Sequence, residues 1–205
     1  MNRRRFVLTA ATALTFPTLL LAQDWKTDPS AFVSHFAQVG IVEVLEAKIS
    51  QKEKAERFRT LFKSLFDIPA IARFVVGRFW RTAQPAEQEK FLTVFEDVIV
   101  YTWNRRFSEY NGQTLKVEST APDGADGSVV NSRIVGKGSN DSFAVQWRLR
   151  KRDDGLRVVD VIIEGVSMAI TYRQEYATII SQQGGMPGLI SALETRARDL
   201  AKEVG

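Results

Sequence analysis

The stretch FAVQWRLRKRDDGLRVVDVIIEGVSMA, residues 143–169, decides the fold class of this chain. Apolar side chains recur at every second position in both of its halves. They are Phe143, Val145, Trp147 and Leu149, and then Val159, Val161 and Ile163. Asp153-Asp154-Gly155, between the halves, is a turn-forming run. Because a period of two places alternate side chains on one face of a strand, the stretch predicts two antiparallel strands joined by a turn.

Two further strands are expected just before this stretch. Their alternating positions are Leu115 and Val117, and then Val130, Ser132 and Ile134. Pro122-Asp123-Gly124 and the run from Gly136 to Asp141 supply the turns. The region therefore predicts an antiparallel meander of about four strands, with the face of Val159, Val161 and Ile163 turned toward the helices.

Helical spacing flanks the meander on both sides. Phe58, Leu61, Phe62, Leu65 and Phe66 follow the i, i+3, i+4, i+7, i+8 pattern of an amphipathic helix. New helices should begin near Pro69 and near Pro85, since proline fits a first helical turn, and the second should run to about Tyr110. After the strands, helical spacing returns from Tyr172, and Pro187 starts a last helix.

The order of helices, meander and helices predicts an α+β fold with the helices packed on one sheet face. No repeat, linker or low-complexity stretch divides residues 23–205, so we expect a single domain.

The first 22 residues have the order of a signal peptide. Arg3-Arg4-Arg5 precedes an apolar run that ends at Ala22, where we expect cleavage. The run Arg3 to Leu8 also resembles a twin-arginine export signal, and the general export route stays open. Either route places the protein outside the cytoplasm.

Charge and composition exclude several functions. Three of the positive charges behind the net charge of +4 belong to this N-terminal segment, so the rest is nearly neutral and lacks the basic face of a nucleic-acid-binding protein. There is no cysteine and one histidine, His35, on an apolar helical stretch. Neither a metal site nor a cofactor site is indicated.

Two constellations could carry catalysis, and each has a simpler interpretation. Ser167 follows a strand as in a nucleophile elbow, but no histidine follows it to accept its proton. Asp160 and Glu164 could form an acid/base pair on one strand face, or they could pair with Arg148 and Arg150 of the neighbouring strand.

Two segments resemble a known family. The first is GRFWRTAQPAEQ (77–88), continuing through Phe91 and Phe95 to SEYNG (108–112). The second joins VQWRL (145–149) to VDVIIEGVSMA (159–169), in which residues 164–168 are the most specific part. Over about residues 30–195 the chain resembles the MlaC-like, toluene-tolerance family of periplasmic phospholipid-binding proteins.

The resemblance implies a non-enzymatic, monomeric lipid carrier. It implies helices over a curved sheet like that of nuclear transport factor 2 (NTF2), with an apolar pocket for acyl chains between them. It also implies two partners, an inner-membrane ABC transporter complex and an outer-membrane lipoprotein complex, which exchange lipid with the carrier and maintain outer-membrane asymmetry. A branch of the family accompanies hopanoid synthesis, which leaves a polycyclic lipid open as the ligand.

Candidate pocket residues follow from the apolar pattern together with the resemblance. They are Phe74, Phe79, Phe95, Ile99, Trp103, Val145, Trp147, Val159, Val161, Ile163, Val166 and Met168. Arg81, Arg148 and Arg173 are candidates for the phosphate of a head group. Two other functions remain open, a small-molecule enzyme that depends on Asp160 or Glu164 and an envelope adaptor without a ligand.

Overall fold

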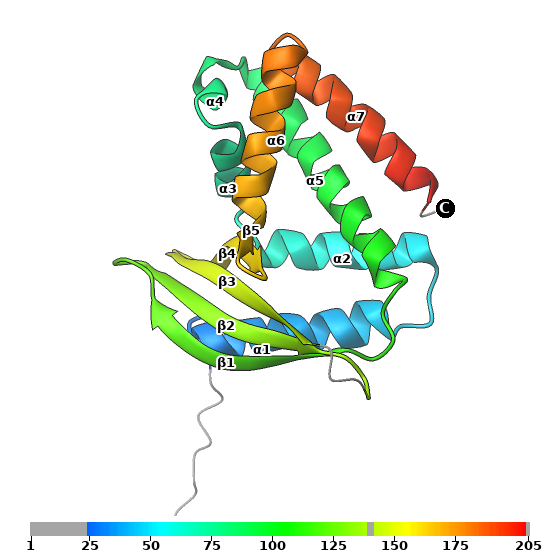
Figure 1. The fold of residues 1–205 in the computed structure, drawn as a ribbon, viewed down its shortest axis with the longest axis vertical. Helices are drawn as coiled ribbons and strands as arrows, with labels where there is room; N and C mark the ends of the chain where they lie inside the picture. The colour runs from blue at the N-terminus through cyan, green and yellow to red at the C-terminus, as the bar shows by residue number, and fades with distance from the viewer. Residues whose placement is uncertain (1–23, 139–141, 204–205) are drawn as a thin grey trace, which may run out of the picture.

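The computed structural model describes residues 24–138 and 142–203. A layer of helices stands over a curved antiparallel sheet, and one helix, α1, lies along that sheet (Figure 1). The predicted α+β class is therefore confirmed. The predicted signal peptide, residues 1–22, lies outside the described residues. Within the described residues, no helix is both long enough and apolar enough to cross a membrane.

From residue 24 onward, six helical segments precede the sheet. They are α1 (Pro29–Val39), the π-helical η1 (Gly40–Leu45), α2 (Gln51–Leu65), α3 (Ile68–Val76), α4 (Phe79–Thr82) and α5 (Pro85–Phe107). Side-chain caps fix several starts: the Asp67 carboxylate accepts from the backbone N–H of Ala70 at 3.0 Å, so α3 begins beside Pro69 as predicted. At α5, the Glu87 carboxylate accepts from the backbone N–H of Gln84 at 2.8 Å.

The sheet has the strand order β1-β2-β3-β4-β5. Its strands are β1 (Thr114–Pro122), β2 (Gly127–Val135), β3 (Ser142–Arg152), β4 (Gly155–Ile163) and β5 (Val166–Ser167). The first four form the predicted meander. The fifth was not predicted, because a strand of two residues shows no alternation.

A bulge in β4 changes which side chains share a face. Trp147 pairs with Val161 and Leu149 pairs with Val158, so Val159 is the extra residue. Since Trp147 and Leu149 point to the same side of β3, their partners Val161 and Val158 also share a side. The bulge therefore interrupts the alternation of the predicted face at Val159, although Val159, Val161 and Ile163 all line the cavity between the sheet and the helices.

The connection from β4 to β5 separates Asp160 from Glu164. Glu164 and Gly165 have φ values of 47° and 80°, and they form a two-residue hairpin turn closed by the pair Ile163 and Val166. Glu164 therefore lies in a turn, and the prediction that it shares a strand face with Asp160 was wrong.

Two helices follow the sheet, α6 (Met168–Gln182) and α7 (Met186–Lys202). Helix α6 begins four residues before the predicted Tyr172, because the Ser167 hydroxyl accepts from the backbone N–H of Ile170 at 3.1 Å and caps the helix. Helix α7 begins beside Pro187, as predicted.

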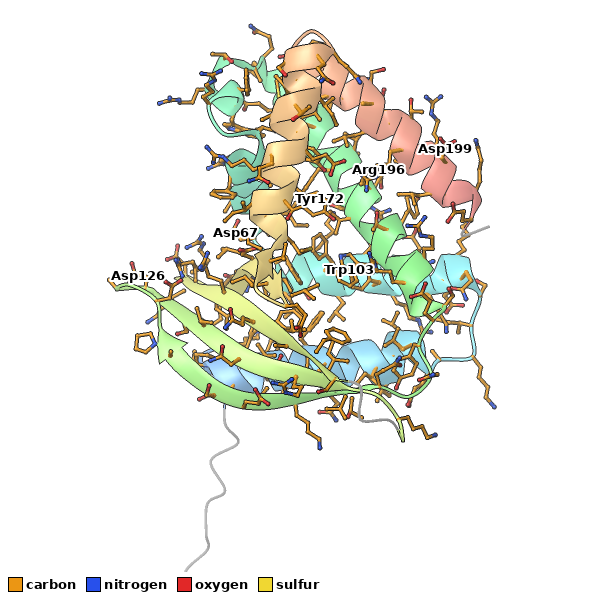
Figure 2. All side chains as sticks on the ribbon, viewed as in Figure 1. Asp67, Trp103, Asp126, Tyr172, Arg196 and Asp199 are labelled. Carbon is orange, nitrogen blue, oxygen red and sulfur yellow. The ribbon has the colours of Figure 1, made fainter. Side chains whose placement is uncertain are left out.

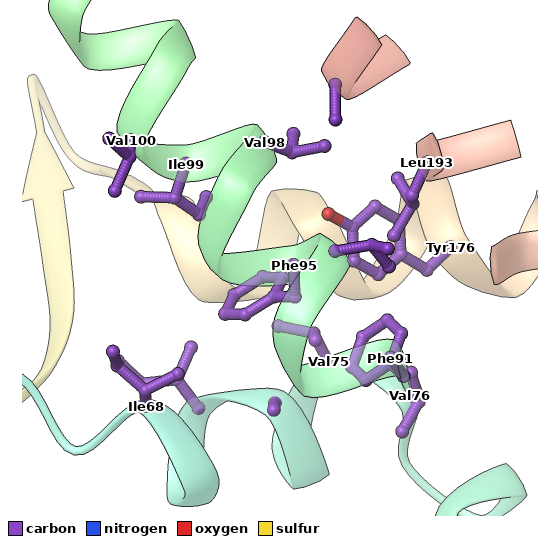
Figure 3. Close-up of a cluster of buried hydrophobic side chains, with 14 of the residues drawn as sticks. Ile68, Val75, Val76, Phe91, Phe95, Val98, Ile99, Val100, Tyr176 and Leu193 are labelled. Atoms are coloured by element: carbon purple, nitrogen blue, oxygen red, sulfur yellow. The ribbon is translucent and has the colours of Figure 1, made fainter. Parts of the chain in front are cut away.

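The buried apolar residues form two separate cores. The helical core joins α2, α3, α5, α6 and α7, and Figure 3 shows its centre, where Phe91 and Phe95 of α5 lie against Tyr176 of α6. The sheet core packs α1 against the inner face of the sheet around Phe32 and Leu149. The molecule thus has two apolar layers that face each other.

Candidate functional site

A cavity of about 600 Å³ lies between the two cores. Its lining is almost entirely apolar and comes from the sheet, α1, η1, α2, α5 and the start of α6. Figure 2 shows side chains of both layers, among them Trp103, extending into the region between them. The volume is within the range of small-molecule binding sites, about 300–1,000 Å³.

The sheet wall of the cavity presents no unsatisfied polar group at its centre. The indole N–H of Trp147 donates to the Ser132 hydroxyl at 3.0 Å, and this hydroxyl donates to the carbonyl of Val145 at 2.8 Å. The side chains of Trp147 and Ser132 are both buried. Because each donor has an acceptor, the wall remains apolar toward the cavity although it contains a serine and an indole N–H.

The helical wall comes mainly from one line of side chains on α5. Phe95, Ile99 and Trp103 are spaced four residues apart, which places them on one face of the helix. From the other layer, the ring of Phe36 on α1 lies edge-on to Trp147 at 5.1 Å and to Phe66 at 6.1 Å. Phe66 packs against both cores and so closes the cavity on this side.

One end of the cavity is polar and exposed. It is lined by Arg106 on the last turn of α5, and by Glu109, Tyr110, Gln113 and Thr114 after that helix. Burial and the neighbouring Glu46 carboxylate raise the pKa of Tyr110, whose hydroxyl lies 3.3 Å from that carboxylate. Among the described residues, neither Arg106 nor Glu109 has an ion-pair partner, and the Arg106 guanidinium lies 5.8 Å from the ring of Trp103.

Asp160 is a buried carboxylate that fixes the start of α6. It accepts hydrogen bonds from the Ser167 hydroxyl at 2.6 Å and from the backbone N–H of Ala169 at 3.0 Å, and it lies 3.7 Å from the Arg148 guanidinium. A negative charge at a helix N-terminus is stabilising. The Glu164 carboxylate instead accepts from the backbone N–H of Ala144.

These contacts also give Ser167 a structural role. Its hydroxyl proton is directed at Asp160, and its oxygen caps α6. The one histidine of the chain, His35, stacks on Trp25 at 3.9 Å. Within residues 24–138 and 142–203, no three His, Asp or Glu side chains are grouped to bind a metal ion.

Most of the predicted pocket residues line the cavity. Those that do are Phe95, Ile99, Trp103, Val145, Trp147, Val159, Val161, Ile163 and Met168. The structure places the other three elsewhere: Phe74 and Val166 are exposed on the surface, and Phe79 packs against the helical core. The period of a sequence identifies apolar faces, but it does not show whether such a face lines a cavity, packs in a core or is exposed.

None of the three predicted head-group arginines lines the cavity. Arg81 is exposed on α4, and Arg148 lies on the opposite side of β3 from Trp147, where it pairs with Asp123 at 3.1 Å. Arg173 donates to the carbonyl of Phe74 at 3.0 Å and so caps the end of α3. The arginine that lines the cavity is Arg106, which sequence analysis missed although it lies three residues after Trp103.

Sequence analysis also missed the wall that α1, η1 and α2 provide. Its residues include Phe36, Ile41, Val44, Leu61 and Phe66. The helical period of these segments was visible in the sequence. The docking of α1 on the sheet, which directs Phe36 at Trp147, depends on tertiary structure.

The fold and the cavity define an α+β protein with an apolar binding pocket between its sheet and its helices. The chain belongs to the MlaC family, since the family model described as MlaC protein matches residues 39–195.

Two relatives illustrate this membership. The chain is 24% identical over 114 residues to the intermembrane phospholipid transport system binding protein MlaC of Haemophilus influenzae, covering 54% of this chain and 53% of that one. It is 22% identical over 107 residues to the toluene tolerance protein ttg2D of Pseudomonas putida, covering 52% and 49%. The matched segments thus span about half the length of these relatives.

A solved structure shares the fold. It is a phospholipid-binding protein from Ralstonia solanacearum in complex with a phospholipid, with a TM-score of 0.76 and 23% sequence identity, covering 85% of this chain and 99% of that one.

Proposed function

We propose that this protein is a non-enzymatic carrier that holds the acyl chains of a phospholipid in the cavity between its two cores. The observation that supports this most directly is the apolar lining, to which both layers contribute. Membership in the MlaC family and the fold shared with a phospholipid-bound protein agree with it.

The energetics explain why a carrier is needed. A lipid with two long chains has roughly 30 methylenes, and at about 0.8 kcal/mol each their exposure to water costs on the order of 20 kcal/mol. A dry cavity removes most of this cost while the lipid crosses an aqueous space. The wall of Phe95, Ile99 and Trp103 opposite Val161 and Ile163 provides that environment.

The polar end of the cavity gives the lipid an orientation. Arg106 lies where the apolar lining ends and has no carboxylate partner among the described residues. A guanidinium binds phosphate through charge-assisted hydrogen bonds. We therefore place the head group at Arg106 and the acyl chains toward Trp147, and this replaces Arg81, Arg148 and Arg173.

The wider role we propose is shuttling in the periplasm after cleavage near Ala22. The lipid would pass between an inner-membrane ABC transporter complex and an outer-membrane lipoprotein complex, maintaining outer-membrane asymmetry. Residues 23–205 would act as a single monomeric domain. A hopanoid remains the alternative cargo, since a polycyclic lipid also needs an apolar cavity.

Mass spectrometry of an organic extract tests the proposal. Protein purified from the periplasm without detergent should yield phospholipid in near-stoichiometric amount. A hopanoid in the extract would identify the cargo as a polycyclic lipid instead. An extract without lipid would contradict a carrier function.

A pair of neighbouring arginines tests the orientation. Arg106→Gln should lower phospholipid affinity roughly tenfold, the effect of losing one hydrogen bond to a charged group. Arg105→Gln is the matched control, because Arg105 is exposed on the same turn but is paired with Glu203 at 3.6 Å and does not line the cavity. Equal effects of the two changes would place the head group elsewhere.

A further inference from the structure

Exposed apolar side chains gather at one corner of the helical layer. Phe74 on α3 is 43% exposed, Val166 on β5 is 53% exposed and Ile170 on α6 is 47% exposed. They are three of the five large apolar side chains that are exposed among the described residues, the others being Val42 and Phe143. None of the three lines the cavity.

Contacts between α3 and α6 bring these side chains to one corner of the molecule. Helices α3 and α6 pack side by side (Figure 1), and the Arg173 guanidinium lies 4.9 Å from the ring of Phe74 while donating to its carbonyl. Ile170 is one helical turn before Arg173, and Val166 is four residues before Ile170. We call the surface of Phe74, Val166, Ile170 and the arginines beside them the α3–α6 corner.

The charges beside Phe74 are positive, and the acidic residue near Val166, Glu164, has its carboxylate bound to the backbone N–H of Ala144. Arg73, Arg78 and Arg81 follow one another along α3 and α4, and Arg173 lies against Gly77 between those helices. Residues 68–86 contain no Asp or Glu. Within the described part of the chain, none of these four arginines has a carboxylate partner. Other arginines of the chain do have carboxylate partners. Arg152, for example, is paired with Asp67 at 2.7 Å.

We propose that the α3–α6 corner docks on the surface of an anionic lipid bilayer. Guanidinium groups that lack a carboxylate partner can bind lipid phosphates, and exposed apolar side chains among them can enter the boundary between head groups and acyl chains. An acidic protein surface would need an apolar patch of matching shape beside its carboxylates, whereas a bilayer has an apolar layer beneath its phosphates everywhere. The apolar and basic side chains together therefore favour a bilayer.

The corner is also adjacent to the cavity. Met168, Ala169 and Tyr172 of α6 line the cavity, whereas Ile170 and Arg173 of the same helix belong to the corner. A bilayer bound at the corner would thus lie against the outer face of a helix whose inner face contacts the cargo. Docking itself does not depend on cargo, and it can be measured apart from cavity occupancy.

Vesicle flotation tests the proposal. At low salt, the protein should float with vesicles of phosphatidylcholine mixed with phosphatidylglycerol and much less with phosphatidylcholine alone. Arg78→Gln combined with Arg81→Gln should lower partitioning roughly 30-fold, since each basic residue near an anionic surface contributes about fivefold. Ile170→Ser should lower partitioning severalfold. High salt should weaken the electrostatic contribution of the arginines to vesicle binding.

Matched controls distinguish binding by the α3–α6 corner from non-specific effects of net charge or of exposed apolar side chains. Lys48→Gln combined with Lys52→Gln removes the same charge from exposed positions outside the corner, and Val42→Ser removes an apolar side chain that is 57% exposed. Both controls should bind like the wild type. Absence of wild-type flotation, or equal losses in corner and control variants, would overturn the proposal and leave an acidic protein as the partner. Cavity lipid, extracted separately, should be unchanged in all four variants.

Discussion

The helical core and the sheet core use apolar side chains in different ways. In the helical core Phe91, Leu189 and Leu193 are almost completely buried, with exposed fractions of 1% or less. On the sheet, Leu115 and Ile134 pack against their core only in part and also line the cavity. The centre of the helical layer is covered by its own side chains, whereas the sheet layer keeps partly buried apolar side chains that face the cavity.

The same difference occurs within a single strand. Val158, before the bulge of β4, is buried to 1% exposure in the sheet core, whereas Val161, after it, lines the cavity. The boundary between solid core and cavity wall thus lies at Val159. Variants on either side of this boundary test it most strongly.

Val158→Glu and Val161→Glu should have the largest and most different effects. A carboxylate at Val158 has no access to water, and burial of the unpaired group should destabilise the fold by on the order of 5 kcal/mol or prevent folding. At Val161 water can enter once the lipid has gone, so the domain should melt cooperatively at a lower temperature and extract without lipid. Thermal unfolding and lipid extraction measure both.

The result at Val161 decides between a wall and a core. A Val161→Glu protein with normal lipid content would place this residue outside the binding site. Failure of this variant to fold would indicate that the strand is packed as solid core beyond the bulge.

A pair of phenylalanines should give the next largest effect. Phe91→Ala removes a ring enclosed by Trp80, Phe95 and Tyr176, and it should lower the free energy of unfolding by roughly 4 kcal/mol. Phe143→Ala removes a ring that is 38% exposed at the cavity, and it should cost under about 1 kcal/mol.

Lipid binding should show the reverse order. Folded Phe91→Ala protein should bind lipid like the wild type, whereas Phe143→Ala should bind more weakly. Urea unfolding and lipid titration of the same samples give both quantities. Equal stability losses would remove the distinction between the two layers.

Ser167→Ala should have the smallest effect, at the junction of the two layers. The change removes the cap of α6 and one hydrogen bond to Asp160, and should cost about 1 kcal/mol in urea unfolding. Ser167→Thr, which keeps the hydroxyl, should recover most of the loss. Ester hydrolysis should be undetectable in both wild type and variant, and turnover that disappears in Ser167→Ala would indicate an enzyme.

The sequence was sufficient for the elements whose signals are local. Pro69 and Pro85 marked helix starts because proline occupies a first turn, and alternation identified the four long strands. Local signals do not reveal a bulge, so the sequence did not show that Val158 rather than Val159 pairs with Leu149. They also do not show which group an arginine contacts. Arg148 pairs with Asp123, and Arg173 donates to the carbonyl of Phe74.

The candidate site required the tertiary arrangement of the chain. Trp103 and Trp147 were recognised as candidates from the sequence, but nothing local indicated that they would face one cavity. Phe36 lies far from both along the chain, and its place beside Trp147 results from the docking of α1 on the sheet. Arg106 differs from the other exposed arginines only in its position at the cavity end.

The packing of α7 on α5 also bears on how the chain acquires its fold. Helix α5 begins at Pro85, and its apolar face is covered by Leu189, Leu193 and their neighbours on α7, which is synthesised only after the whole sheet. Contacts between such distant segments raise the contact order and slow folding. Until α7 has been synthesised, α5 has an uncovered apolar face, which makes a partial chain prone to aggregation and a target for chaperones.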